Sequence, residues 1–246
     1  MLNYTLESDL GARANIGLIV LATDCTLETE WRHLIDLPGV TVHTARMPAA
    51  IRPGPDGLAD LADHIGPAAR LLVPGLELDV IAFGCTSATT VLGERNIREI
   101  LQGVRPGTPF TTPITAVLTA LQGLGSGRIA MVTPYGAETN EVEVRYMREA
   151  GIEVCNLVTF GAVDDVVAAR IDARTLRTAV LAAAEAKEAE AIFVSCTSLR
   201  CARLIPTLEM VVGRPVISSN QALAWHALRL SGIRESMPRQ GRVFKL

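Results

Sequence analysis

Asp79-Val80-Ile81-Ala82-Phe83-Gly84-Cys85-Thr86-Ser87 is one of two stretches of matching design in this chain; the other is Ala191-Ile192-Phe193-Val194-Ser195-Cys196-Thr197-Ser198. Each begins with a short apolar run of the length of a buried strand, followed by a cysteine, Thr-Ser and a helical pattern. Strands that alternate with helices are typical of a parallel α/β protein, in which ligands bind beyond the carboxyl ends of the strands. We therefore expect an α/β fold with both cysteines at such strand ends.

The alternation of strands and helices extends outward from both stretches and runs twice through the chain. In the first half we expect strands at residues 16–21, 40–43 and 79–83 and helices at 28–37, 58–72 and 96–102. In the second half we expect strands at 128–132, 152–158 and 191–194 and helices at 138–150 and 172–189. Nearly the same number of residues separates Ile16 from Cys85 as Ile129 from Cys196, which indicates an internal duplication into two similar α/β halves.

This duplication predicts two domains between which the chain crosses twice. Residues 1–114 together with 216–246 form the predicted N-terminal domain, and residues 115–215 form the second domain. A helix at 115–124 makes the first crossing, and a last helix at 221–230 is expected to pack back on the first half. Because both cysteines lie at strand ends, we expect the active site in the cleft between the domains.

The composition is that of an ordinary globular protein. The chain has 246 residues, of which 49% are hydrophobic and 20% charged, with a net charge of −3. The charged residues are not predominantly basic and the arginines are scattered along the chain, so nucleic acid is not an expected partner. No apolar stretch reaches the roughly 18 residues of a membrane span, and the first 13 residues lack the basic start and apolar core of a signal peptide. We expect a cytoplasmic protein with no membrane partner.

The sequence gives no sign of a metal or an organic cofactor. Five cysteines without a signal peptide or Cys-x-x-Cys spacing fit neither a disulfide framework nor a zinc site. We find no phosphate loop and no dinucleotide fingerprint, and the two lysines, Lys187 and Lys245, lie in no pyridoxal-phosphate context. We therefore expect cofactor-independent chemistry with no bound metal.

The repeated cysteines are the main candidates for that chemistry. A cysteine just before a helix faces unpaired backbone N–H groups and the positive end of the helix dipole, which lowers the pKa of its thiol. We therefore expect reactive thiolates at Cys85 and Cys196. The hydroxyls and amides of the Thr-Ser pairs that follow suit a substrate carboxylate; these residues are Thr86, Ser87, Thr197 and Ser198. The alternatives are two small buried apolar residues or a disulfide, which the cytoplasm disfavours.

Polar residues near other strand ends are candidates for capping a helix or for binding substrate. Asp24 follows the first strand, where it is expected to cap the next helix or to bind substrate, two roles that do not exclude each other. Tyr135, in the corresponding loop of the second half, is either partly exposed packing or holds a substrate oxygen. The pair Asp164-Asp165 is typical of a helix cap, and Ser218-Ser219-Asn220 is expected to cap the final helix.

Together these residues resemble the aspartate/glutamate racemase superfamily and, within it, the group of maleate cis-trans isomerases and arylmalonate decarboxylases. The segments that carry the resemblance are residues 17–20, 26–30, 84–87, 133–135 and 195–200. The resemblance implies two Rossmann-like domains around a pseudo-twofold axis, with Cys85 and Cys196 facing each other across the cleft and no cofactor. It also implies that Cys85 is the nucleophile, that Cys196 handles the proton and that Tyr135 binds substrate.

Two departures from the pattern of this group bear on the substrate. The decarboxylases lack the first cysteine, so Cys85 favours isomerisation or racemisation of a small carboxylate. Asp24 and Asp165 stand where maleate isomerases tend to have asparagine, and carboxylates there favour a cationic amino group, as in the sub-branch associated with ectoine degradation. Decarboxylation of an arylmalonate and a non-catalytic small-molecule sensor are the alternatives. We further expect a homo-oligomer, whose size the sequence does not give.

Overall fold

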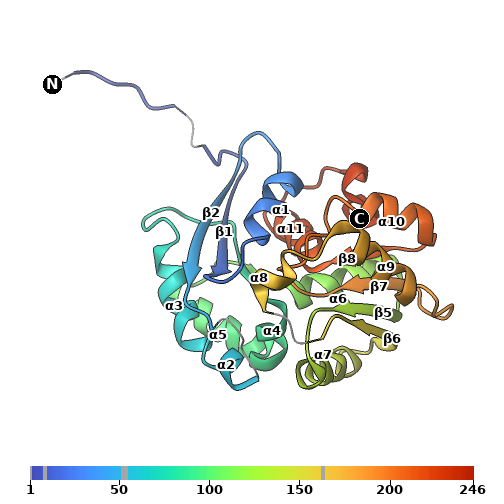
Figure 1. Ribbon diagram of the computed structural model, residues 1–246. Coiled ribbons are helices and arrows are strands. Elements are labelled where there is room, and N and C mark those ends of the chain that lie inside the picture. The colour runs from blue at the N-terminus through green and yellow to red at the C-terminus, as the bar shows by residue number, and fades with distance from the viewer. Residues whose placement is uncertain (1, 8–9, 51–54, 162–163) are drawn as a thin grey trace.

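Two four-stranded parallel sheets form the frame of the protein (Figure 1). The structure, a computed structural model, describes residues 2–7, 10–50, 55–161 and 164–246. The first sheet has the order β2-β1-β3-β4 and the second the order β6-β5-β7-β8. The strands are β1 (Ala14–Leu21), β2 (Val40–Met47), β3 (Val80–Gly84), β4 (Phe110–Thr111), β5 (Arg128–Thr133), β6 (Glu153–Thr159), β7 (Ala191–Val194) and β8 (Val216–Ser218). The predicted α/β fold of two similar halves is confirmed.

The central strands form because their side chains are apolar on both faces. Every residue of β1, β3 and β7 is buried, as expected for strands of a parallel sheet that is covered on both sides. The register also repeats between the halves: Ile16 pairs with Val80 in the first sheet, and Ile129 pairs with Ala191 in the second. The carboxyl ends of β3 and β7 therefore occupy corresponding positions in the two sheets.

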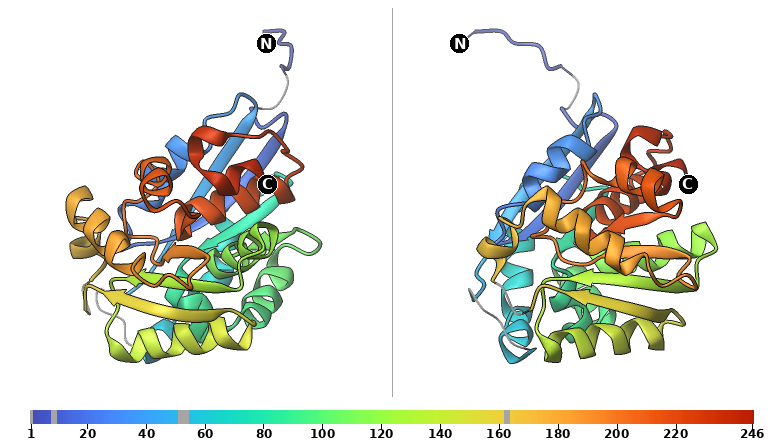
Figure 2. Two further views of the ribbon diagram at one scale, coloured as in Figure 1. Left: turned by 90° about the vertical axis from the view of Figure 1, so that its right-hand side faces the viewer. Right: turned by 45° about the vertical axis from the view of Figure 1, so that its right-hand side comes forward.

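Eleven α-helices in the described part of the chain connect and cover these strands. They are α1 (Leu27–Leu34), α2 (Pro55–Ala59), α3 (Ala62–Leu71), α4 (Thr86–Leu92), α5 (Glu94–Val104), α6 (Pro113–Leu124), α7 (Ala137–Glu149), α8 (Asp165–Ala168), α9 (Ala173–Ala183), α10 (Ile205–Val212) and α11 (Ser219–Leu230). Of these, α7 packs on β6 along one side of the second sheet (Figure 2). None of the described helices is long and apolar enough to cross a membrane.

Two helix predictions were wrong in extent. The helix expected at 58–72 is two helices, α2 and α3, separated by a turn in which the Leu61 N–H donates to the Leu58 carbonyl at 3.3 Å. The helix expected at 172–189 ends at Ala183. The Arg214 guanidinium donates to the carbonyls of Ala186 and Ala189 at 2.7 and 2.6 Å, so these groups are satisfied without further helical turns.

Helices α6 and α11 join the two halves through a shared core. One cluster of buried side chains contains Ile16 of β1, Val117 of α6, Met131 of β5 and Leu223 of α11. The last helix thus packs on the first half, as predicted. One domain boundary was wrong, because Val216–Ser218 pairs with β7 in the second sheet, and the chain returns to the first half only with α11. The rest of the domain division stays a prediction.

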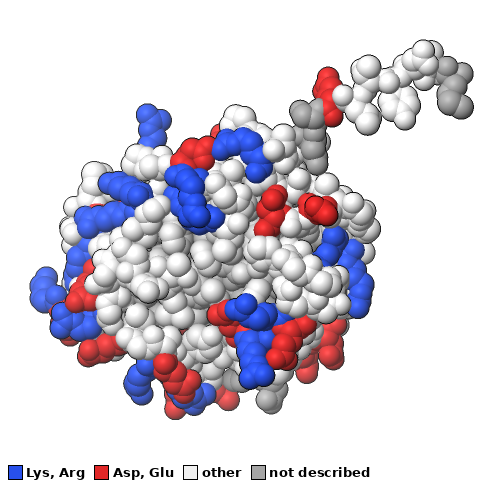
Figure 3. All heavy atoms as spheres, turned by 180° about the vertical axis from the view of Figure 1, so that it is seen from behind, with Lys and Arg blue, Asp and Glu red and all other residues white. Residues whose placement is uncertain are grey.

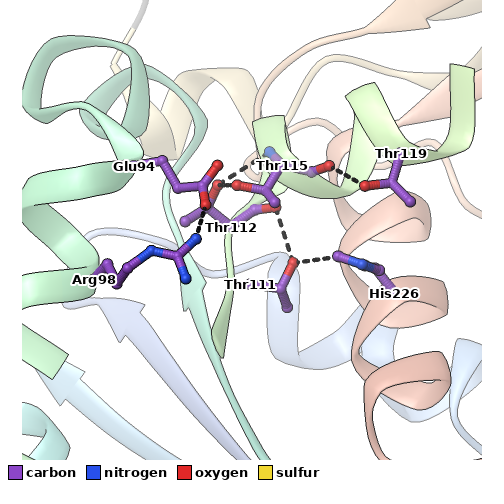
Figure 4. Close-up of polar contacts among 7 residues, drawn as sticks. All are labelled: Glu94, Arg98, Thr111, Thr112, Thr115, Thr119 and His226. Atoms are coloured by element: carbon purple, nitrogen blue, oxygen red, sulfur yellow. Dashed lines mark hydrogen bonds and ion pairs between the residues drawn. The ribbon is translucent and has the colours of Figure 1, made fainter. Parts of the chain in front are cut away.

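Threonine side chains form hydrogen bonds at the start of α6 and between β4 and α11 (Figure 4). Thr112 caps α6 by accepting the N–H of Thr115 at 3.2 Å. The hydroxyl of Thr111 lies 2.8 Å from Nδ1 of His226 on α11. These contacts anchor the start of α6 and join the end of β4 to α11.

The face seen in Figure 3 carries acidic and basic side chains interspersed, in keeping with the small net charge. The expectations that the protein does not bind nucleic acid and lies in the cytoplasm stay predictions.

Candidate active site

Cys85 lies where the sequence predicts, at the carboxyl end of β3 and at the N-cap of α4. Its Sγ accepts the backbone N–H of Ala88 at 3.4 Å. The preceding residue has to be glycine, because a Cβ on Gly84 would lie 2.3 Å from Leu27 Cδ2 and 2.9 Å from the Ile19 carbonyl oxygen. Close packing of α1 on β3 therefore fixes the height of Cys85 above the sheet.

Cys196 follows β7 but, contrary to the prediction, no helix begins there. Residues 197–199 form a turn, and the next helix, α10, begins only at Ile205. Cys196 has a φ of +126°, a conformation that residues other than glycine rarely adopt. The N–H of Ser198 donates to its Sγ at 3.4 Å. The second motif thus offers a single backbone amide where the first offers a helix N-terminus.

Ser219, the first residue of α11, brings the two cysteine motifs together. Its Oγ accepts a hydrogen bond from the hydroxyl of Thr86 at 2.9 Å and another from the N–H of Cys196 at 3.1 Å. Tyr135 lies close to both thiols: its pKa is raised first by burial and also by the charges of Cys196 and Cys85. Cys85, Cys196 and Tyr135 therefore belong to one site between the halves.

Asp165 ties that site across the two halves. Its Oδ1 accepts from the hydroxyl of Ser198 at 3.0 Å, and its Oδ2 accepts from the hydroxyl of Thr23 in the loop after β1 at 2.5 Å. Figure 1 shows α8, which Asp165 begins, between α1 and the second sheet. The capping role expected of this pair falls to Asp164, which accepts the N–H of Val167 at 2.8 Å.

Asp24 caps α1, which is the first of its two interpretations. Its Oδ1 accepts the N–H groups of Thr26 and Leu27 at 2.7 and 2.9 Å and so caps α1. Its Oδ2 is buried and has no hydrogen bond of normal geometry among the described residues. Burial raises the pKa of Asp24, and the nearby Thr197 hydroxyl lowers it. The substrate-binding interpretation of Asp24 stays a prediction.

The expectation of low thiol pKa values was wrong. Cys85 is 5% and Cys196 6% exposed. Burial, with a smaller contribution from the charge of Asp165, raises the pKa of Cys85 to about 12 against the effect of the Ala88 amide. Burial and then Asp165 also raise the pKa of Cys196, against hydrogen bonds from Ser198 and Tyr135. Desolvation outweighs one or two amides, so both thiols are protonated at neutral pH.

The hydroxyls expected to bind a carboxylate are largely engaged within the protein. Thr86 donates to Ser219 and Ser198 donates to Asp165. The hydroxyl of Ser87 lies 3.8 Å from Cys85 Sγ, and that of Thr197 lies near Asp24. In the described part of the chain no group of three or more His, Cys, Asp or Glu side chains is arranged to hold a metal ion.

The comparison with known families agrees with this geometry. Residues 17–244 match the family described as arylmalonate decarboxylase. The chain belongs to this family. The arylmalonate decarboxylase of Bordetella bronchiseptica is 35% identical over 140 residues, which span 56% of this family member and 58% of that enzyme. The maleate isomerase of Pseudomonas putida is 25% identical over 244 residues, which span 93% and 96%.

Solved structures of maleate isomerases have the same fold as this chain. The maleate isomerase Iso from Pseudomonas putida S16 superimposes with a TM-score of 0.84 at 25% identity, over 94% of this chain and 98% of that one. A Nocardia farcinica maleate cis-trans isomerase mutant with a covalently bound succinylcysteine intermediate matches with the same TM-score, identity and coverage. The predicted resemblance to the group of maleate isomerases and arylmalonate decarboxylases is confirmed. Membership of the sub-branch associated with ectoine degradation stays a prediction.

Several residues that shape the site of this family member were missed in the sequence. Asn220 was expected only to cap α11, yet its Nδ2 donates to the Thr197 carbonyl and to Glu30 Oε2, both at 2.8 Å. Oε1 of Glu30 accepts the N–H of Ala202 at 2.7 Å. The sequence signal for this role of Glu30 was its place on the buried side of α1. Its hydrogen-bond partners could not be predicted, because they lie more than half the chain length away in the sequence.

Proposed function

We propose that this protein is a cofactor-independent isomerase of a small carboxylate in which Cys85 and Cys196 are the two reacting thiols. The observation that carries the proposal is the meeting of both cysteines and Tyr135 around Ser219, at one buried site between the halves. The covalent succinylcysteine in the Nocardia farcinica relative supports a thiol that adds to a four-carbon acid.

In this proposal the Cys85 thiol first gives its proton to a carboxylate of the substrate, and the resulting thiolate adds its sulfur to one carbon of the double bond; the same proton returns to Cys85 at the end of the cycle. The π electrons move to the neighbouring carbon and its carboxylate, and that carbon takes a proton from Cys196. Rotation about the new single bond follows. Cys196 then removes a proton, the carbon–sulfur bond breaks, and Cys85 regains its electron pair as the trans product leaves. No net proton or electron is consumed, so the step requires no redox partner.

The rest of the site supports binding and proton control. The amide of Ala88 stabilises the Cys85 thiolate, and the amide of Ser198 and the phenol of Tyr135 stabilise that of Cys196. Because burial holds both thiols protonated, Cys196 is already in the form that donates a proton, whereas Cys85 adds only after its own proton has moved to a substrate carboxylate. This requirement keeps Cys85 inert until substrate fills the site.

Asp24 favours a second candidate, the racemisation of an amino-acid derivative. Its Oδ2, which among the described residues has only the Thr197 hydroxyl nearby, is a suitable acceptor for a substrate ammonium group, whereas both oxygens of Asp165 are already engaged by hydroxyls. One thiolate would remove the α-proton while the other thiol donates to the opposite face. The variant Asp24→Asn separates the candidates: it weakens turnover of amino acids if Asp24 binds ammonium, and it improves or preserves turnover of maleate.

The test is turnover of maleate, of amino acids with chiral detection, and of arylmalonates with detection of carbon dioxide. We expect Cys85→Ala and Cys196→Ala each to lower kcat at least about a thousandfold with the fold intact. Cys155→Ser on β6, outside the site, is the matched control. Decarboxylation without isomerisation, or ligand binding without any turnover, would replace the proposal with the decarboxylase or the sensor.

A further inference from the structure

The backbone at Cys196 requires a reason for its shape. A φ of +126° is strained for any residue with a Cβ, and such strain persists only where the surroundings fix it. Cys85 is not strained, with a φ of −147°. Contacts that are absent around Cys85 in the described part of the chain must therefore hold Cys196 in this backbone conformation.

The difference lies in the residue before each cysteine. Gly84 has no side chain, whereas Ser195 is fully buried and uses both its backbone and its side chain. Its N–H donates to the Val132 carbonyl at 2.8 Å, and its Oγ donates to Oε1 of Glu143 at 2.5 Å. The N–H of Cys196 is held in turn by Ser219. Hydrogen bonds thus hold both the residue before Cys196 and the backbone N–H of Cys196 itself.

Glu143 is an unusual residue to find at such a place. It lies on α7 with no exposed surface, and its Oε2 has no hydrogen-bond partner among the described residues. An apolar side chain would fill this position in the core at no desolvation cost. Burial raises the pKa of Glu143 to about 7, and Ser195 is the partner that lowers it.

The same face of α7 also holds Tyr135. One turn before Glu143, Asn140 donates from Nδ2 to the Tyr135 carbonyl at 2.9 Å, and its Oδ1 accepts from the Thr133 hydroxyl at 2.6 Å. The charge of Glu143 contributes to the raised pKa of Tyr135, so the two side chains lie close together. Helix α7 therefore supports both Tyr135 and the turn that carries Cys196.

We propose that Glu143 is a positioning residue that holds Cys196 in its strained conformation through the hydroxyl of Ser195. Glu143 and Ser195 form a clamp on the residue before the cysteine, and Ser219 holds the cysteine itself. The effect of this clamp on turnover rests on the proposed function. Its effect on the geometry of Cys196 does not, and it can be measured without substrate.

The first experiment measures the alkylation rates of Cys196 and Cys85 by iodoacetamide, resolved by peptide mass spectrometry, which also separates the exposed Cys25. In Glu143→Leu and Ser195→Ala we expect Cys196 to react about tenfold faster, because the released turn opens more often. The rate at Cys85 stays unchanged. Glu141→Gln, on the exposed side of α7, is the matched control. Equal changes at both cysteines, or none at Cys196, overturn the proposal.

The second experiment measures turnover of the same variants on the substrate that the wild type accepts. We expect Glu143→Leu and Ser195→Ala to lower kcat about tenfold with little change in KM, and the double variant to be no worse than either single variant. Glu143→Gln, whose amide oxygen still accepts from Ser195, restores most of the loss. Additive losses would show independent structural effects and contradict the clamp. A wild type without turnover contradicts the proposed function, while the alkylation rates still decide the role of Glu143.

Discussion

The hydroxyl of Thr86 donates a 2.9 Å hydrogen bond to the hydroxyl of Ser219, and this contact joins the first residue of α4 to the first residue of α11. The same Ser219 oxygen accepts the N–H of Cys196. One buried oxygen is therefore shared by two motifs that belong to different sheets. The relative position of the two thiols depends on a residue outside both motifs.

Replacement of Ser219 by alanine tests this shared oxygen. Ser219→Ala leaves the buried N–H of Cys196 and the Thr86 hydroxyl without their acceptor, so we expect a loss of about 1–3 kcal/mol in the free energy of unfolding. We also expect kcat to fall about tenfold. Ser218→Ala removes the cap of α11, for which Ser218 accepts the N–H of Gln221 at 3.2 Å. That control loses about 1 kcal/mol in urea unfolding. If it loses as much turnover as Ser219→Ala, the shared oxygen has no special role.

Gly84 provides a test of how tightly Cys85 is placed. In Gly84→Ala the new Cβ collides with Leu27 and with the backbone oxygen of Ile19, so the end of β3 must move. We expect a destabilisation of about 1–3 kcal/mol together with a loss of turnover at Cys85. Gly103→Ala in α5 meets open space and is expected to stabilise the helix by up to about 1 kcal/mol. Thermal unfolding and kcat for both variants check the prediction, and normal activity in Gly84→Ala contradicts it.

Asp165 is expected to control the ionisation of both thiols. Its charge raises the pKa of Cys196 and of Cys85, and for Cys196 it ranks directly after burial. Asp165→Asn removes the charge while keeping an acceptor for one hydroxyl. We expect alkylation of both thiols to begin at lower pH, with the larger change at Cys196. Asp164→Asn, at the cap of α8, serves as the control. Unchanged pH profiles in Asp165→Asn rule out this electrostatic role.

Two buried carboxyls predict how stability depends on pH. Burial raises the pKa of Glu30 and of Glu143 from 4.5 to about 7. Between these values the folded protein binds more protons than the unfolded chain. The free energy of unfolding therefore falls as pH rises through this window, by at most about 1.4 kcal/mol per pH unit for each carboxyl, and levels off above it. Urea unfolding from pH 4.5 to 8 measures the slope. Glu143→Gln should reduce it, and a slope that rises with pH in this window would falsify the assignment.

The sequence predicts the central strands because they are short apolar runs with both faces buried. It does not predict which way the chain turns after the second cysteine, because Cys-Thr-Ser is the same in both motifs. The helix at Cys85 and the turn at Cys196 differ through the residues before them, Gly84 and Ser195, and through partners on distant elements.

The direction of the thiol pKa shifts could not be predicted from the sequence either. A helix N-terminus is visible in a local pattern, and the expectation of a lowered pKa at Cys85 rests on it alone. The degree of burial depends on how elements distant in the sequence pack around the thiols, and that burial decides the sign of the pKa shift. For the same reason the sequence does not predict what Ser219, expected only to cap the last helix, and Glu143 do at the site, since each bonds to residues 23 or more positions away.

The core that α6 and α11 share with both sheets bears on how the molecule folds. Ile16 of the first sheet and Met131 of the second lie in one continuous apolar cluster with Val117 and Leu223 of these helices. A fragment cut between the halves would expose its side of that cluster to water. Although the plan is duplicated, the two copies form a single cooperative unit, and we expect them to melt in one transition rather than two.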